Sequence, residues 1–144
     1  MDYPIRHLRE TDYDQLIRLW RRAGLTHRPH GRDSYASMSS EFGRAETCIL
    51  GIYDGDKLIG SIIGTSDGRR GWMNRLAIDP DYRGRGLAGW LIKEAENFLS
   101  GFGIKVMAAL IEDENLPSIS AFQKAGYIHG ENILYFSKRS SSED

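Results

Sequence analysis

The most informative stretch of this sequence is Asp79-Pro80-Asp81-Tyr82-Arg83-Gly84-Arg85-Gly86-Leu87-Ala88. Its glycines alternate with arginines directly before an apolar helical pattern begins at Leu87. Glycine lets successive backbone N–H groups point into one hollow, and the first turn of a helix adds unpaired N–H groups and a positive dipole end. Such a turn can bind a phosphate-bearing ligand. The alternative is a solvated glycine turn whose arginines serve only solubility.

The residues after this turn predict the strongest helix of the chain. Apolar residues recur there at helical spacing, opposite a polar face. They are Leu87, Ala88, Leu91, Ile92, Ala95, Phe98, Leu99 and Phe102. After a stop at Gly101 and Gly103, we expect a buried strand over residues 105–111 and a short helix over 116–125, closed by Gly126. Two further strand-like pieces, 127–130 and 133–137, complete this half of the chain.

The residues before the turn predict an antiparallel meander. Strand signals over 48–53 and 58–63 flank a hairpin turn, and a third strand is expected over 72–79. Further upstream, a strand over 4–9 precedes a helix over 13–23, and a second helix is expected over 34–42. This element order predicts an α/β (α+β) fold with a mixed sheet covered by helices.

A dinucleotide-binding turn is the main rival interpretation. Gly84, Gly86 and Gly89 are spaced as G-x-G-x-x-G, and Glu112 follows where such a fingerprint has an acidic residue. In that fold, however, the strand runs almost directly into the first glycine, whereas here five residues separate Ile78 from Gly84. The unit also follows a meander rather than opening a series of βαβ repeats. We therefore reject the dinucleotide interpretation.

Two motifs in register resemble the GNAT acetyltransferase superfamily. Residues 83–88, Arg-Gly-Arg-Gly-Leu-Ala, match the family motif Q/R-x-x-G-x-G/A. Residues 115–127, Asn-Leu-Pro-Ser-Ile-Ser-Ala-Phe-Gln-Lys-Ala-Gly-Tyr, resemble its second signature, N-x-x-A-x-x-x-Y-x-K-x-G-F. The resemblance covers nearly the whole chain and is weakest between residues 25 and 47. It implies the GNAT fold, with a central mixed, mostly antiparallel sheet of six to seven strands flanked by about four helices.

The resemblance also implies acetyl-CoA (CoA) as co-substrate, without a metal, and names the residues that bind it. They are Leu76, Ala77, Ile78, Arg83, Gly84, Arg85, Gly86, Leu87, Ala88, Asn115, Ser118 and Phe122. Backbone N–H groups in residues 83–88 are expected to hold the pyrophosphate. The edge of residues 76–78 is expected to pair with the pantetheine arm as an extra strand would, and Asn115 to hydrogen-bond that arm.

The implied activity is N-acetyl transfer, in which a primary amine attacks the thioester directly in a ternary complex. The acceptor is a small-molecule amine or a protein N-terminus, and a backbone N–H of Ala77 or Ile78 is expected to stabilise the oxyanion. The family often has a tyrosine that protonates the leaving thiolate, where this chain has Phe122. This departure favours the alternative function, a non-catalytic acyl-CoA-binding or sensing module.

The sequence leaves the catalytic residues unidentified. Five polar side chains lie in segments that could border the acceptor site, and each could equally be an ordinary surface or turn residue. They are Glu41, Asp67, Asn74, Glu112 and Asp113. The pair His27-x-x-His30 is spaced like metal ligands, but it lies in a Pro/Gly loop without a matching cluster, so we expect no metal site.

Composition bounds the remaining questions. The 144 residues fit one domain over 1–139 followed by a disordered tail over 140–144. With 19 basic and 20 acidic residues the net charge is −1, which excludes a global field for nucleic acid or an anionic membrane. A single cysteine, Cys48, and no signal or membrane-spanning pattern predict a cytoplasmic location. Tyr135 and Phe136 in the last strand-like piece leave a homodimer open.

Overall fold

The computed structural model describes residues 3–142 and 144. Residues 1–2 and 143 lie outside the described residues, so the predicted domain 1–139 and the predicted tail 140–144 are each described only in part. No helix in the described part of the chain combines the length and the apolar character needed to cross a membrane.

Within these residues the sheet has five strands in the order β1-β2-β3-β4-β5. The first four run antiparallel to their neighbours, and β5 pairs parallel to β4. The strands are β1 (Ile5–His7), β2 (Cys48–Asp54), β3 (Lys57–Ser66), β4 (Arg70–Ile78) and β5 (Val106–Ala109). A meander and one helical crossover produce this mixed sheet, as the sequence predicted.

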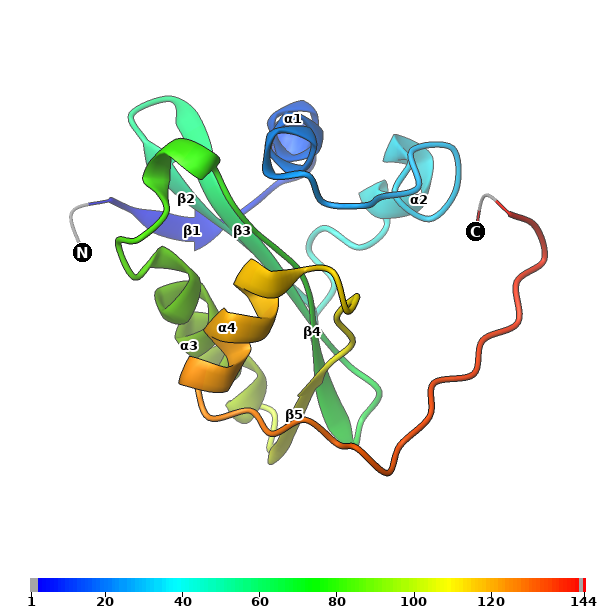
Figure 1. The fold of residues 1–144 in the computed structure, drawn as a ribbon. Helices are drawn as coiled ribbons and strands as arrows, with labels where there is room; N and C mark the ends of the chain where they lie inside the picture. The colour runs from blue at the N-terminus through cyan, green and yellow to red at the C-terminus, as the bar shows by residue number, and fades with distance from the viewer. Residues whose placement is uncertain (1–2, 143) are drawn as a thin grey trace.

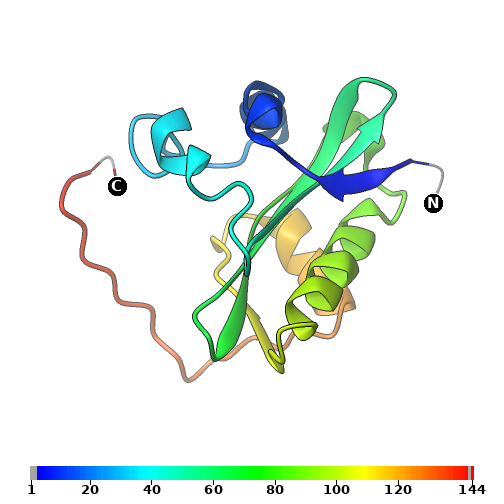
Figure 2. The same ribbon diagram turned by 180° about the vertical axis from the view of Figure 1, so that it is seen from behind.

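Helices cover both faces of the sheet (Figure 1 and Figure 2). The α-helices are α1 (Tyr13–Ala23), α2 (Tyr35–Ser39), α3 (Leu87–Ser100) and α4 (Leu116–Lys124). Two short 3-10 turns, η1 (Glu10–Asp12) and η2 (Pro80–Tyr82), precede α1 and α3. Helices α3 and α4 pack into one apolar cluster with the sheet, and α1 and α2 pack into a second cluster on the other face.

The central strands are buried on both sides because their successive side chains enter different clusters. In β2, Ile49 joins the α1 cluster whereas Leu50 joins the α3 cluster, and β3 repeats this alternation with Leu58 and Ile59. Alternation follows from the period of two in an extended strand. Each fully buried Leu or Ile contributes roughly 1.5–3 kcal/mol relative to exposure, so both helical layers stabilise the sheet.

Strand β4 is irregular, and its irregularity opens the sheet. The β3–β4 register shifts between Ser61 and Ile63, and Arg75 opposite the shift has a positive φ of 55°. Strand β5 pairs with β4 only over Arg70–Met73, whereas β4 continues to Ile78. The far half of β4 therefore has no strand on its β5 side among the described residues, and the two strands diverge there.

The prediction of two C-terminal strands over 127–130 and 133–137 is wrong for the residues that the structure describes. No strand follows α4 in the described residues, and every residue from 128 to 142 is exposed. The sheet therefore has fewer strands than the expected six to seven. The apolar pattern is present, but a strand needs a partner, and this segment leaves the body of the molecule without one (Figure 1).

Candidate functional site

A large cavity of about 1440 Å³ follows the divergence of β4 and β5. One end is lined by the glycine turn and the first residues of α3, and the other by the segment between α1 and α2. The far half of β4 forms the wall between these two ends. The volume exceeds the roughly 300–1,000 Å³ of an ordinary small-molecule pocket, and Tyr135 and Arg139 of the C-terminal segment form part of its lining.

The glycine turn presents unpaired backbone donors to this cavity. Gly84 and Gly86 have positive φ values of 78° and 77°, and Gly86 precedes α3 as its N-cap. No side chain caps this helix start, so the N–H groups of its first turn point outward without an intrahelical acceptor. A Cβ built on Gly84 would meet no atom within 4 Å, which leaves room for a ligand close to the backbone. These features fit a phosphate group.

Asp79 fixes the start of the turn. Its carboxylate is 2% exposed and accepts hydrogen bonds from Arg22 Nε at 2.9 Å and from the backbone N–H of Asp81 at 2.9 Å. Lys57 Nζ lies 3.4 Å from the same carboxylate. Burial acts to raise the pKa of Asp79, but the hydrogen bonds and the two cations outweigh it and lower the pKa. The anion therefore holds the end of β4 against α1.

The edge of β4 offers backbone groups next to the turn. Ile78 is paired with Gly60, and the following N–H, that of Asp79, donates to Ile59 O at 2.8 Å. Successive N–H groups along a strand point to opposite sides. The N–H of Ala77 therefore points towards β3, like that of Asp79, whereas the N–H of Ile78 points towards the gap between β4 and β5. Of the two N–H groups considered for the oxyanion, only that of Ile78 thus faces the cavity.

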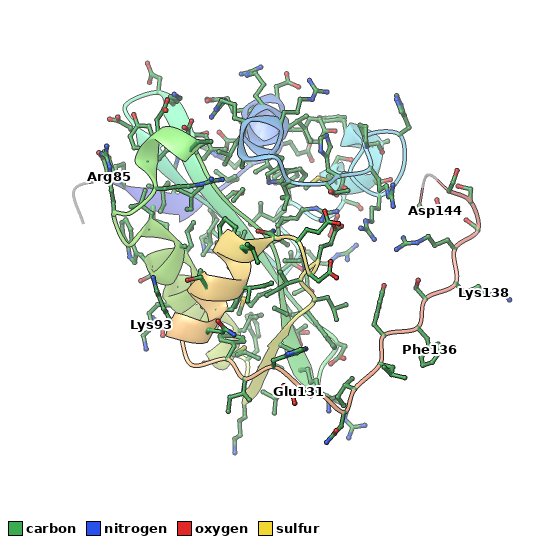
Figure 3. All side chains as sticks on the ribbon, in the orientation of Figure 1. Arg85, Lys93, Glu131, Phe136, Lys138 and Asp144 are labelled. Carbon is green, nitrogen blue, oxygen red and sulfur yellow. The ribbon has the colours of Figure 1, made fainter. Side chains whose placement is uncertain are left out.

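Most of the sequence-predicted residues lie around this one cavity. Those that line it are Leu76, Ala77, Ile78, Arg83, Gly84, Gly86, Leu87, Ala88, Asn115, Ser118 and Phe122. Arg85 does not line it. Its guanidinium donates to Tyr3 Oη at 2.8 Å and lies over the Tyr82 ring at 4.9 Å, at the edge of the molecule (Figure 3).

The second motif forms the cavity wall opposite the turn. Asn115 Oδ1 accepts a hydrogen bond from Ser118 N at 3.2 Å and so caps α4. This leaves the side-chain NH₂ of Asn115 as its remaining donor. Phe122 is 3% exposed and packs edge-to-face on Tyr127, with ring centroids 4.9 Å apart. The hydroxyl of Tyr127 donates to Glu96 Oε2 at 2.8 Å, so the nearest phenol to Phe122 is already bound.

A buried ion pair that sequence reasoning missed organises the other end. Arg75 Nη2 donates to Asp33 Oδ2 at 2.7 Å, with both side chains largely buried. The guanidinium lies 5.5 Å from the centre of the Trp20 ring, and Asp33 also accepts from the backbone N–H of Arg28 at 2.7 Å. A charged residue in the interior of a mostly apolar strand was the available signal for Arg75.

Three of the five candidate bases line the cavity, namely Glu41, Asn74 and Glu112. Burial raises the pKa of the Glu41 carboxyl, and Asp33 adds to this, whereas Arg44 and Arg75 act to lower it. A carboxylate with a raised pKa is a stronger base at neutral pH than an exposed one. Glu41 is therefore the strongest candidate in the cavity.

Asp67 and Asp113 do not line the cavity. Asp67 lies in the β3–β4 turn, where hydrogen bonds from the backbone of Arg70 and Arg69 lower its pKa to about 2. Cys48 is fully buried, and burial raises the pKa of its thiol to about 11, so it is a core residue rather than a nucleophile. In the described part of the chain, no group of three or more His, Cys, Asp or Glu side chains is arranged to hold a metal ion.

A sheet that diverges beside a glycine-rich helix start without a side-chain cap is typical of proteins that can bind an extended, phosphate-bearing co-substrate beside a second ligand. Comparison with known proteins gives the family. Residues 7–127 match the model of the acetyltransferase (GNAT) family. The chain is 32% identical over 135 residues to the acetyltransferase SG1711 of Sodalis glossinidius, with 94% of each chain covered. It is 30% identical over 137 residues to the acetyltransferase plu1384 of Photorhabdus laumondii, again with 94% of each covered.

The chain therefore belongs to the GNAT acetyltransferase family, and it is an N-acetyltransferase that uses acetyl-CoA as co-substrate and an amine as acceptor. Solved structures share the fold. The aminoglycoside acetyltransferase AAC(6')-Iy, in complex with a bisubstrate analogue of CoA, superposes with a TM-score of 0.78 at 18% identity, covering 96% of this chain and 99% of that one. The PaiA N-acetyltransferase of Thermoplasma acidophilum, in complex with coenzyme A, gives 0.75 at 22% identity, covering 86% and 88%.

Proposed function

We propose that the acceptor is a small cationic amine, which enters the α1–α2 end of the cavity and meets acetyl-CoA across β4. The observation that carries this proposal is the continuity of one cavity from the helix start at Gly86 to the carboxylate of Glu41. Glu112 and Glu114 also line it. Basic side chains such as Arg32, Arg83 and Lys124 line the same cavity, so its carboxylates attract a cation locally and not through a field of the whole cavity. A second positive charge on the amine would gain from this attraction only where it lies beside one of these carboxylates.

The co-substrate would be held by backbone groups rather than by charged side chains. The uncapped N–H groups after Gly86 suit the pyrophosphate, and Arg83, whose side chain is exposed at the cavity, can add charge. The N–H of Ile78 faces the divergence, where an extended pantetheine arm can add as a strand. Arg85 would contribute only its backbone N–H, because its guanidinium is bound to Tyr3.

Glu41 would act as the base. The acceptor amine must lose a proton to attack the thioester carbonyl, and Glu41 is the half-buried carboxylate on the acceptor side of the cavity. The N–H of Ile78 would stabilise the negative charge that develops on the carbonyl oxygen. A general acid would help the thiolate to leave but is not obligatory, since a thiol has a pKa of only about 8.5. Phe122 would then pack beside the thioester arm without transferring a proton.

We also propose that the active form is a homodimer and that the protein acts in the cytoplasm. Large apolar side chains after Tyr127 are exposed in the single chain, and a second copy would cover them. The single buried thiol of Cys48 is compatible with a reducing compartment.

Release of CoA thiol in the presence of acetyl-CoA and a panel of amines tests the acceptor class. The panel contains a linear polyamine, an amino sugar, a neutral amino acid amide and a peptide with a free N-terminus. We expect the two polycationic amines to give kcat/KM values about tenfold or more above the others. Turnover confined to the peptide would contradict the proposal and favour a protein N-terminus. Absence of turnover with every amine, although acetyl-CoA binds, would favour a non-catalytic acyl-CoA-binding module.

A further inference from the structure

One proton of the reaction has no donor among the motif residues. When the C–S bond of the thioester breaks, its electron pair stays on the CoA sulfur, which then takes up a proton. Phe122 lines the cavity at the motif position but has no proton to donate. A phenol hydroxyl from another part of the cavity can act as the general acid instead.

Tyr135 has the one tyrosine hydroxyl that makes no hydrogen bond within the described residues, which include all seven tyrosines of the chain. Of the other hydroxyls, four donate to a carboxylate, one donates to a backbone carbonyl and one accepts from a guanidinium. They belong to Tyr35, Tyr53, Tyr82, Tyr127, Tyr13 and Tyr3. Among these, only Tyr82 lines the main cavity, and its hydrogen bond to Asp54 raises its pKa to about 12. A phenol held in this way releases its proton less readily, so Tyr135 is the available phenol in the cavity.

The course of the C-terminal segment turns Tyr135 towards the cavity. The segment leaves α4, passes the end of β5 and runs towards the side of α2 (Figure 1 and Figure 2). Phe136 and Lys138 project away from the body (Figure 3), whereas Tyr135 and Arg139 line the cavity. This is the alternation of side chains that an extended backbone imposes. Tyr135 is 64% exposed, so its hydroxyl is open to a ligand in the cavity.

We infer that Tyr135 is a catalytic residue whose hydroxyl protonates the leaving thiolate of CoA. The inference rests on the proposed attack of an amine on acetyl-CoA in this cavity. The amine nitrogen bonds to the carbonyl carbon, the C–S bond breaks, and the sulfur takes the proton of Tyr135 Oη to give CoA thiol. The phenolate regains a proton from water, and the proton that the amine loses leaves through Glu41. A residue outside both motifs thus supplies the phenol that the motif position lacks.

Steady-state kinetics of three variants test this role. Tyr135→Phe is expected to lower kcat by about tenfold to 100-fold, with little change in the KM for acetyl-CoA, because it removes a general acid. Tyr35→Phe removes the same hydroxyl from an exposed ring that does not line the cavity, and it should keep the wild-type kcat. The double variant Tyr135→Phe/Phe122→Tyr places a phenol at the motif position and should recover most of the lost kcat. A wild-type kcat in Tyr135→Phe would overturn the inference, as would a double variant that binds acetyl-CoA normally and stays as slow as Tyr135→Phe.

Binding of CoA tests the same contact without an acceptor amine. At about pH 9 most of the CoA thiol is ionised, and a hydroxyl that donates to the thiolate adds affinity. By isothermal titration at this pH, the wild type should bind CoA about threefold or more tightly than an analogue with hydrogen in place of the thiol, and Tyr135→Phe should bind the two alike. An equal preference for CoA in both proteins would overturn the inference, whichever amine the enzyme acetylates. Failure of the proposed base is a separate outcome, because it would appear as full activity in Glu41→Gln.

Discussion

Arg75 and Asp33, which are 42 residues apart in the chain, form a 2.7 Å ion pair that joins β4 to the segment between α1 and α2. Arg75 holds this position with a φ of 55° at the point where the register of β3 and β4 shifts. A left-handed backbone costs a non-glycine residue roughly 1–2 kcal/mol, so the contacts of the side chain must offset that strain. The pair thus fixes both the α1–α2 end of the cavity and the divergence of β4.

Loss of the ion pair is expected to destabilise the fold. In Arg75→Ala, Asp33 keeps its hydrogen bond from Arg28 N but becomes a buried charge without its cation. We expect the free energy of unfolding to fall by about 3 kcal/mol in urea titration. Arg69→Ala, in the exposed β3–β4 turn, serves as the control and should change it by less than about 0.5 kcal/mol. Equal stability of the two variants would show that the pair is not structural.

Asp79 is expected to make the free energy of unfolding depend on pH in the acid range. Its folded-state pKa is lowered, so it contributes stability that is present above the ordinary aspartate pKa and is lost as pH falls through the lowered value. Asp79→Asn should therefore reduce the free energy of unfolding by about 2 kcal/mol at pH 7, and this difference should shrink towards zero below about pH 4. Urea titrations at several pH values measure it. A difference that is constant with pH would assign the effect to packing instead.

The glycine turn allows a matched pair of substitutions. Gly84 and Gly68 both have positive φ, 78° and 88°, and both have open space around a built Cβ. Gly84→Ala and Gly68→Ala should thus carry the same backbone cost of roughly 1–2 kcal/mol and lower Tm alike. Only Gly84→Ala should also raise the KM for acetyl-CoA, by about tenfold, because only Gly84 lines the cavity. An equal effect of both substitutions on KM would remove the turn from the co-substrate site.

Glu41 should control both the pH–rate profile and the stability of the acceptor end. Glu41→Gln is expected to reduce kcat/KM by about 100-fold. In the wild type, the ascending limb of the pH–rate profile should lie at a higher pH than an ordinary carboxyl group would give, because the pKa of Glu41 is raised, and this limb should be absent from the variant. Because the folded pKa is raised, ionised Glu41 costs stability as pH rises through it. Glu41→Gln should therefore be more stable than wild type at pH 8 and equal to it near pH 4. If the ascending limb of the pH–rate profile is unchanged in the variant, it reports ionisation of the acceptor amine and not of Glu41.

Much of this architecture could be predicted because local patterns decide it. The glycine turn and the apolar stripe of α3 depend on neighbouring residues, so their positions followed from spacing. The two family motifs then indicated that residues 76–88 and 115–122 lie together, and most of these residues line the cavity. The direction of the Arg85 side chain could not be predicted, because its partner, Tyr3, is 82 residues away in the chain.

What the sequence did not reveal depends on distant partners. The Arg75–Asp33 pair joins segments with no shared motif, and the left-handed backbone at Arg75 has no glycine to mark it. The strand predicted over 133–137 is wrong for the described residues, which form no strand after α4, because an apolar run becomes a strand only where it pairs with a neighbour. Pattern alone gives the propensity of a strand and cannot give its partner.

The most direct test of the central claim, that the turn at 79–88 builds an acetyl-CoA site, is the thermal shift of the purified protein with saturating acetyl-CoA, CoA or NAD. A ligand at a hundred times its Kd adds about 2.7 kcal/mol, which raises Tm by several degrees in a domain of this size. We predict a rise with acetyl-CoA and CoA, none with NAD, and a smaller rise in Gly84→Ala than in Gly68→Ala. No rise with either CoA species would contradict the account.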